Sequence, residues 1–187
     1  CKRDVLAQGS IGQIIYEGAE AGDVSPDEAG LLVRSLLSAG VDTTVSGIGN
    51  MLNLFAQNPD QWALLRSDPS LINFAFEEAI RVEGPVQTFF RTSAMATELS
   101  GVPVGDNEKL VLFLGGANRD PRRWDDPDRF DIARKPSGHL AWGNGVHRCV
   151  GMRIAQMDAE AILKAMLARI ELIEPTGPAK IRLNNTL

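Results

Sequence analysis

The chain has 187 residues, of which 44% are hydrophobic and 23% are charged, and its formal net charge is −5. This length is enough for one sizeable buried core or two small ones, so the composition predicts a globular protein. Lysine and arginine are scattered rather than clustered, which argues against nucleic-acid binding. No stretch reaches the roughly 18–20 uninterrupted apolar residues of a membrane span, and no signal-peptide pattern is present, so we expect no membrane association and a cytoplasmic location.

The two cysteines, Cys1 and Cys149, lie far apart in the sequence. They form neither a disulfide framework nor the closely spaced thiol pairs of a zinc site, so each is interpreted alone. Because the sequence starts at a cysteine and ends without an evident terminal element, we interpret the chain as an excised part of a longer protein.

The first elements in chain order are helical. Apolar spacing favours a helix between residues 3 and 22, although three glycines within it weaken that prediction. A long helix is predicted over 25–57, because Ser25, Pro26 and Glu28 form a capping box and apolar periodicity continues to Asn58. At about 1.5 Å per residue this helix is roughly 50 Å long.

The elements after residue 58 change from helical to mixed. The predicted segments are a short helix over 62–66, an amphipathic helix over 70–83, strand-like pieces at 86–91, 96–99 and 109–113 with a turn at 101–103, a helix over 150–171 and one strand after residue 175. The stretch 118–151 shows no periodicity, and an ordered loop of that length is usually functional. The expected fold is therefore mainly α with a small β component, with a ligand held by the long loop.

The most informative segment is 142–151, with the sequence WGNGVHRCVG, directly before the last helix. Its glycines permit a tight turn and a close approach of the backbone to a flat ligand. The turn ends by placing the thiol of Cys149 at a helix N-terminus, which favours a thiolate. Taken alone, a single cysteine before a helix is more often a small buried hydrophobic residue, and only the whole ten-residue pattern favours a functional thiolate.

This segment resembles the haem-binding loop of cytochromes P450, which has the pattern aromatic, Gly-x-Gly-x-His/Arg-x-Cys-x-Gly. The resemblance implies haem b as cofactor, Cys149 as the axial ligand of iron, and Trp142, Gly143 and Gly151 as further haem-loop residues. Trp142 departs from the phenylalanine common in the family. We expect its indole N–H to hydrogen-bond the thiolate and raise the reduction potential.

A second pattern is AGVDTT at 39–44, within the long helix. A glycine followed by hydroxyl-bearing β-branched residues favours a local kink that leaves room for a small molecule. The residues alone allow the alternative that Gly40 makes a close helix contact and Asp42 is solvated. By resemblance to cytochromes P450, Asp42 and Thr43 are the acid–alcohol pair that relays protons to dioxygen.

A third pattern is Glu78-x-x-Arg81, an i,i+3 pair that by itself is no more than an ordinary helix ion pair. In cytochromes P450 such a pair joins an arginine of the long loop in a buried structural network. By that resemblance the third member here is Arg134 or Arg129, and we favour Arg134. The resemblance further assigns Arg91 and His147 to the haem propionates and the segment 118–127 to the meander.

The segments PVQTFFR at 85–91 and NNTL at 184–187 look most similar to bacterial cytochromes P450 that oxidise para-substituted benzoic acids, including 4-methoxybenzoate. Ser35, Ser38 and Ala39 share a helix face with Asp42 and are expected to line a substrate pocket. Val86 and Phe89 are expected to form its other wall, with plain core packing as the alternative.

The resemblance covers nearly the whole chain and implies one incomplete cytochrome P450 domain over 1–187, the C-terminal half of that fold. The expected function is dioxygen activation to hydroxylate or O-demethylate a small aromatic acid, with electrons from a ferredoxin and its reductase steered by Arg122, Arg123, Arg148 and Arg153. Two alternatives are a non-catalytic haem–thiolate module and a helical interaction domain. We expect the chain on its own to bind haem poorly and to be inactive.

Overall fold

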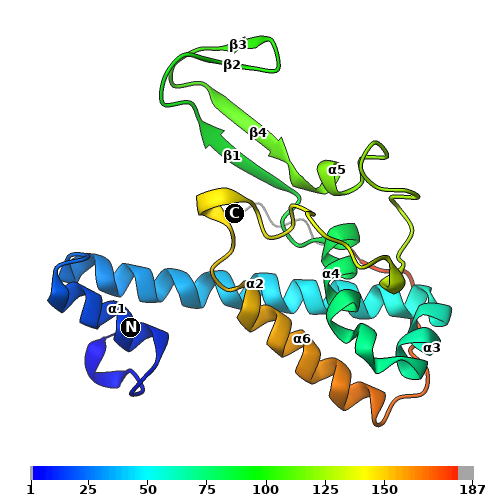
Figure 1. The fold of residues 1–187 in the computed structure, drawn as a ribbon. Helices are drawn as coiled ribbons and strands as arrows, with labels where there is room; N and C mark the ends of the chain where they lie inside the picture. Colours follow the sequence, from blue (N-terminus) through cyan, green and yellow to red (C-terminus); the bar gives the residue numbers. More distant parts are fainter. Residues whose placement is uncertain (1, 181–187) are drawn as a thin grey trace. The chain divides into compact units, whose positions relative to one another are not determined.

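The structure, a computed structural model, describes residues 2–180 and divides into two compact units, Cys1–Val45 and Ser46–Leu187. The boundary lies within one helix, α2 (Pro26–Gln57), so each unit is described by itself. The elements are mainly helices, with two small two-stranded sheets (Figure 1). This confirms the expected class, mainly α with a small β component.

The first unit contains a 3-10 turn (Arg3–Val5), helix α1 (Ile11–Ala21) and the beginning of α2. The helix predicted over 3–22 starts later than expected, because Gly9 has a φ of 74° and interrupts the segment. The side chain of Ser10 then caps α1 by accepting a hydrogen bond of 3.2 Å from the N–H of Gln13. Gly22, with a φ of 87°, ends the helix.

Helix α2 begins with the predicted capping box. The backbone N–H of Glu28 donates to Ser25 Oγ at 3.3 Å, and the N–H of Ser25 donates to Glu28 Oε2 at 2.8 Å. The pair therefore satisfies two N–H groups that the helix itself leaves without partners. In the first unit, Ala29 and Val33 of this helix are buried.

The second unit has a helical core. It contains the end of α2 together with α3 (Pro59–Ser67), the 3-10 turn Pro69–Leu71, α4 (Ile72–Glu83) and α6 (Met152–Leu167). The fully buried side chains Met51, Phe55, Trp62, Leu65 and Leu163 belong to this core. Phe55 contacts both Trp62 and Phe130 edge to face, with ring centroids 5.3 Å apart in each pair. Helix α4 packs against α6 and thereby joins early and late parts of the sequence.

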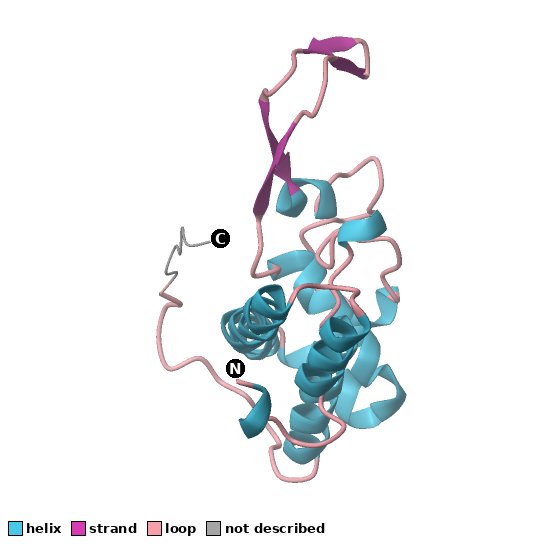
Figure 2. Ribbon diagram, turned by 90° about the vertical axis from the view of Figure 1, so that its left-hand side faces the viewer, coloured by secondary structure: helices cyan, strands magenta, loops and turns pink. Residues whose placement is uncertain are grey.

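The strands pair as two antiparallel ribbons, β1 (Thr88–Thr92) with β4 (Lys109–Phe113) and β2 (Thr97–Leu99) with β3 (Val102–Val104). They extend away from the helices of the same unit, as Figures 1 and 2 both show. The turn between β2 and β3 is formed by Ser100 and Gly101, both with positive φ, so Val102 and Pro103 lie in a strand rather than in the predicted turn.

The long segment after the strands is mostly irregular. A short helix, α5 (Leu114–Asn118), precedes it, and two 3-10 turns, Ile132–Arg134 and Gly145–His147, interrupt it. Residues 175–180 contain no strand, and residues 181–187, including the NNTL segment, lie outside the described part of the chain. No helix in the described part is long and apolar enough to cross a membrane.

Candidate haem-binding site

The turn before α6 is closed by backbone hydrogen bonds. The N–H of Cys149 donates to the carbonyl oxygen of Trp142 at 2.8 Å, and the N–H of Arg148 donates to that of Gly145 at 3.1 Å. Gly143 and Gly145 have φ values of 69° and 64°, which side-chain-bearing residues rarely adopt. A Cβ on Gly143 would also lie 3.1 Å from the carbonyl oxygen of His147. The glycine pattern is therefore required by the shape of this turn.

Cys149 has an exposed, free thiol directly before α6. Its Sγ lies 3.9 Å from the position that a Cβ would take on Gly151. Beside it, Val146 and Val150 are 97% and 81% exposed, an unusual exposure for two valines flanking a cysteine. A free thiol just before a helix N-terminus, close to exposed apolar side chains and glycine backbone, suits a flat apolar group with a metal at its centre.

A haem fits this donor set better than an iron bound by protein ligands alone. Within residues 2–180, no three His, Cys, Asp or Glu side chains are grouped in a way that could hold a metal ion. The propionates of a haem held by Cys149 would need hydrogen-bond or ion-pair donors nearby. His147 is exposed two residues before the cysteine.

Arg91, the second predicted propionate donor, is half-buried in β1. Its guanidinium lies 5.0 Å from the ring centroid of Phe89, and its Nη1 donates to the carbonyl oxygen of Phe90 at 2.8 Å. Phe89, a predicted substrate-pocket residue, is 44% exposed, and Val86 is half-buried. Strand β1 thus carries the cationic Arg91 and the aromatic Phe89 next to each other.

The Trp142 side chain differs from its expected role. Its indole N–H donates to the carboxylate of Glu77 on α4, with Nε1 3.0 and 3.1 Å from the two oxygens, rather than to the sulfur of Cys149. The ring packs against Phe76 with centroids 6.1 Å apart. The expectation of an indole–thiolate hydrogen bond overlooked this acceptor, because the sequence does not show which face of α4 meets the cysteine turn.

The Glu78–Arg81 pair is completely buried, with both side chains 0% exposed. Arg81 donates to Glu78 through Nε at 2.8 Å and Nη2 at 2.9 Å, a bidentate pair. Arg134 Nε donates to the same carboxylate at 3.0 Å. Of the two arginines considered as third member, Arg134 thus contacts Glu78, while Arg129 offers Arg81 its backbone carbonyl oxygen at 3.2 Å.

The same network binds the irregular segment to α4. Arg81 Nη1 donates to the carbonyl oxygens of Asn118 and Pro127, each at 2.8 Å, and its guanidinium lies 5.1 Å from the Trp124 ring centroid. Arg134 donates to the carbonyl oxygens of Asp125 and Asp126 at 2.6 and 3.1 Å. Carbonyl groups of the irregular segment are thereby satisfied by the buried Arg81 and the partly buried Arg134.

In the first unit, the predicted proton-relay and pocket residues lie on α2. The hydroxyl of Thr43 donates to the carbonyl oxygen of Ala39 at 2.6 Å, and Asp42 is exposed. Ser35 and Ser38 make similar hydrogen bonds to Leu31 and Ser35 carbonyl oxygens at 2.8 and 3.2 Å. Residues 39–44 stay helical, and no atom lies within 4 Å of a Cβ built on Gly40, so within the described residues this glycine makes no close helix contact.

The predicted basic residues are not equally free to attract a partner. The exposed Arg122 binds the half-buried Asp120 at 2.5 Å and holds the pKa of that carboxyl at about 2, so an ionised carboxylate offsets much of the Arg122 charge. The guanidinium of Arg123 lies 4.6 Å from the Trp124 ring centroid and donates to the carbonyl oxygen of Ser137. Arg148 and Arg153 are exposed and contact neutral groups.

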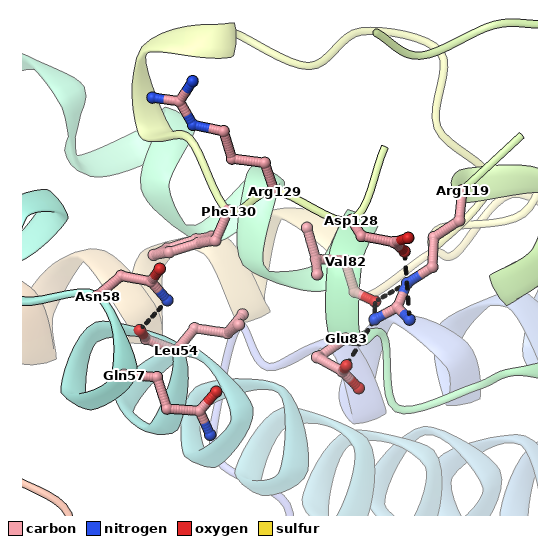
Figure 3. Close-up of a pocket in the computed structure, with 9 residues that line it drawn as sticks. All are labelled: Leu54, Gln57, Asn58, Val82, Glu83, Arg119, Asp128, Arg129 and Phe130. Carbon is pink, nitrogen blue, oxygen red and sulfur yellow. Dashed lines mark hydrogen bonds and ion pairs between the residues drawn. The ribbon is translucent and has the colours of Figure 1, made fainter. Parts of the chain in front are cut away.

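A crevice of about 450 Å³ lies between the ends of α2 and α4 and the irregular segment (Figure 3). Arg119 spans it, donating to the carbonyl oxygen of Val82 at 2.8 Å and to Glu83 at 2.5 Å. Cys149 does not line it. Arg119 also lies 3.7 Å from Asp128, so its side chain connects α4 with the irregular segment.

Sequence reasoning missed Glu77 and His139. His139 Nε2 lies 2.7 Å from Glu77 Oε2, and the two residues line a second cavity of about 470 Å³ together with Trp142 and Arg148. Burial raises the pKa of Glu77. Hydrogen bonds with His139, Gln156 and Trp142 lower this pKa by a larger amount, so the net pKa is below the ordinary 4.5. The sequence signal was only a second glutamate beside Glu78.

The family model described as "Cytochrome P450" matches residues 3–186 of the chain. The chain is 54% identical over its full length to cytochrome P450 CYP199A2 of Rhodopseudomonas palustris, and covers 45% of that protein. It is 44% identical over 157 residues to cytochrome P450 107B1 of Saccharopolyspora erythraea, which covers 83% of this chain and 39% of the relative. The chain thus spans less than half the length of these relatives.

Solved structures show the same likeness. The tirandamycin C-bound monooxygenase TamI superposes with a TM-score of 0.81 at 31% identity, over 89% of this chain and 42% of that chain. Cytochrome P450 CREJ in complex with (4-ethylphenyl) dihydrogen phosphate has a TM-score of 0.77 at 31% identity, over 82% of this chain and 39% of that chain.

Proposed function

Since the chain belongs to the cytochrome P450 family, we propose that it supplies the haem-binding part of a monooxygenase that oxidises a small para-substituted aromatic acid. The observation that supports this most strongly is the exposed thiol of Cys149 at the end of a glycine-dependent turn, before α6. The chain covers under half of its relatives, so the activity belongs to the whole protein of which these residues form part.

The cofactor in this proposal is haem b, with Cys149 as the axial ligand. Haem supplies the redox chemistry that activates dioxygen, and a thiolate ligand favours cleavage of the O–O bond. Gly143 and Gly151 would allow the turn to approach the macrocycle closely. Trp142 would lie on the side of the macrocycle that faces the protein. His147 and Arg91 supply donors for the two propionates.

Asp42 and Thr43 are the proposed proton-relay residues. The Thr43 hydroxyl now donates to the Ala39 carbonyl oxygen, and a rotation about its side-chain bond redirects this proton toward a substrate-side acceptor. Asp42 is exposed, which suits its proposed place at the solvent end of the relay. A module that only binds haem needs no such relay, which favours the enzyme over the non-catalytic alternative.

The residues proposed to contact the substrate are Ser35, Ser38 and Ala39 of α2 in the first unit, and Val86 and Phe89 in the second unit. Small and hydroxyl-bearing residues leave space along the helix, while the apolar pair suits an aromatic ring. The ligand named in the CREJ complex, (4-ethylphenyl) dihydrogen phosphate, is a phosphate ester whose acidic group lies para to an alkyl group, and this pattern supports the proposed substrate class. The electron donors in this proposal are a ferredoxin and its reductase.

The test is turnover of 4-methoxybenzoate by the whole protein, supplied with a ferredoxin, its reductase and NADH. O-demethylation consumes one dioxygen, two electrons and two protons, and yields 4-hydroxybenzoate, formaldehyde and water. We expect equimolar formaldehyde and 4-hydroxybenzoate, and neither product from Cys149→Ala. A haem-loaded, reducible protein that binds and oxidises none of a series of para-substituted benzoates would exclude this substrate class.

A further inference from the structure

Glu77 gathers donors from three separate segments. Its carboxylate accepts the indole N–H of Trp142 at 3.0 Å and the side-chain amide of Gln156, from α6, at 2.6 Å. His139 Nε2 lies 2.7 Å from Oε2, the oxygen that also accepts the 3.0 Å hydrogen bond from Trp142, whereas Gln156 binds Oε1. Helix α4 thus contacts the start of the cysteine turn, the segment before it and the helix after it through one side chain.

The tautomer of His139 follows from its partners. The backbone N–H of Ala141 points at His139 Nδ1 at 3.3 Å, so this nitrogen accepts and the ring proton is on Nε2. Nε2–H then donates to Glu77. The imidazole is only 4% exposed and the Glu77 side chain 17%, so this hydrogen bond is shielded from water.

Trp142 links the hydrogen bonds of Glu77 to the cysteine turn. Its carbonyl oxygen accepts the N–H of Cys149 at 2.8 Å, and the N–H of Gly143 donates to Leu140 at 2.9 Å. The backbone of residue 142 therefore closes the turn, while its ring is fixed by Glu77 and by Phe76, whose ring centroid lies 6.1 Å away. Loss of these contacts would free the side chain of the residue whose carbonyl oxygen holds the Cys149 amide.

We propose that Glu77 is a positioning residue that holds Trp142 and His139 and thereby fixes the turn that presents Cys149 for iron ligation. This inference rests on the proposed haem–thiolate function, and it assigns a role to a residue outside the family motif. It also implies that the indole N–H is engaged by Glu77 and leaves the thiolate unchanged, so Trp142→Phe should leave the reduction potential unaltered.

The test compares Glu77→Ala, Trp142→Phe and the double variant in the whole haem-loaded protein. Glu83→Ala is the matched control, because Glu83 is on the same helix but pairs with Arg119 in a partly exposed site. The measurements are the share of the thiolate-type carbon monoxide band, the rate of haem release and the reduction potential. Glu77→Gln, which keeps one acceptor oxygen, tests rescue.

We expect Glu77→Ala to release haem about tenfold faster, the factor for one charge-assisted hydrogen bond, and to convert part of the carbon monoxide band to the form without thiolate. Glu77→Gln should recover part of the loss, and the effect of Glu77→Ala should be smaller in the Trp142→Phe background. Equal behaviour of Glu77→Ala and Glu83→Ala, or a changed potential in Trp142→Phe, would overturn the proposal. Absence of the thiolate band in the parent protein would instead refute the haem–thiolate function itself.

Discussion

Replacing Glu78 with alanine should remove the anchor between α4 and the irregular segment. Four donors point at its carboxylate: Nε and Nη2 of Arg81, Nε of Arg134 and the backbone N–H of Asp131. Arg81 retains carbonyl partners, but its buried charge loses its counter-ion. Breaking a buried pair in this way costs about 3–5 kcal/mol, a large part of the roughly 5–15 kcal/mol that stabilises a typical domain.

The assay is the yield of soluble, haem-loaded protein and, where it folds, its free energy of unfolding in urea. Glu83→Ala is again the control, because its pair with Arg119 is 46% and 37% exposed and such pairs contribute about 0–1 kcal/mol. We expect Glu78→Ala to yield little haem-loaded protein and Glu83→Ala to behave like the parent. Soluble, haem-loaded Glu78→Ala with a loss no larger than that of the control would refute this reasoning.

Three further outcomes are expected. Thr43→Ala should lower product formed per electron by roughly tenfold or more while dioxygen consumption continues, whereas Thr44→Ala should not; equal coupling in both would exclude the relay. Reduction by an acidic ferredoxin, measured by stopped flow, should slow sharply when the ionic strength doubles. Charge reversal at Arg148 should slow this reduction more than charge reversal at Arg122, whose charge is offset by Asp120. A reduction rate that does not depend on salt would contradict electrostatic steering. The folded pKa of Glu77 is below 4.5, so the ionised carboxylate stabilises the fold above that pH, and this contribution is lost as the pH falls through the folded value. Between about pH 5 and pH 3, Glu77→Gln should therefore lose less stability than the parent. An equal loss of stability in the two proteins would contradict this prediction.

Features encoded in local sequence were predictable. The Ser25 and Glu28 capping box forms because cap and helix residues lie three positions apart. The cysteine turn is equally local, since its two glycines at positive φ and the thiol lie within one short segment. Membership of the cytochrome P450 family, inferred from that segment and from the order of the other motifs, is confirmed by the family match.

Features that depend on which surfaces meet were harder to predict. Residues 77 and 78 are both glutamates; the motif pointed to Glu78 and Arg134, which are in contact, but only the packing of α4 shows that Glu77 meets Trp142. The indole N–H was therefore assigned to the wrong acceptor. The sequence also does not show that Ser100 adopts a positive φ, which moves the turn between β2 and β3 and leaves Val102 in a strand.

The central claim is that Cys149 ligates haem iron as a thiolate. The most direct test is the carbon monoxide difference spectrum of the ferrous, haem-reconstituted chain, both alone and fused to the N-terminal part of one of its relatives, with Cys149→Ala in parallel. The account predicts the strongly red-shifted Soret band of thiolate ligation in the fusion, its loss in Cys149→Ala, and little haem binding by the chain alone. A folded fusion that binds haem without this band, or that keeps the band in Cys149→Ala, would contradict it.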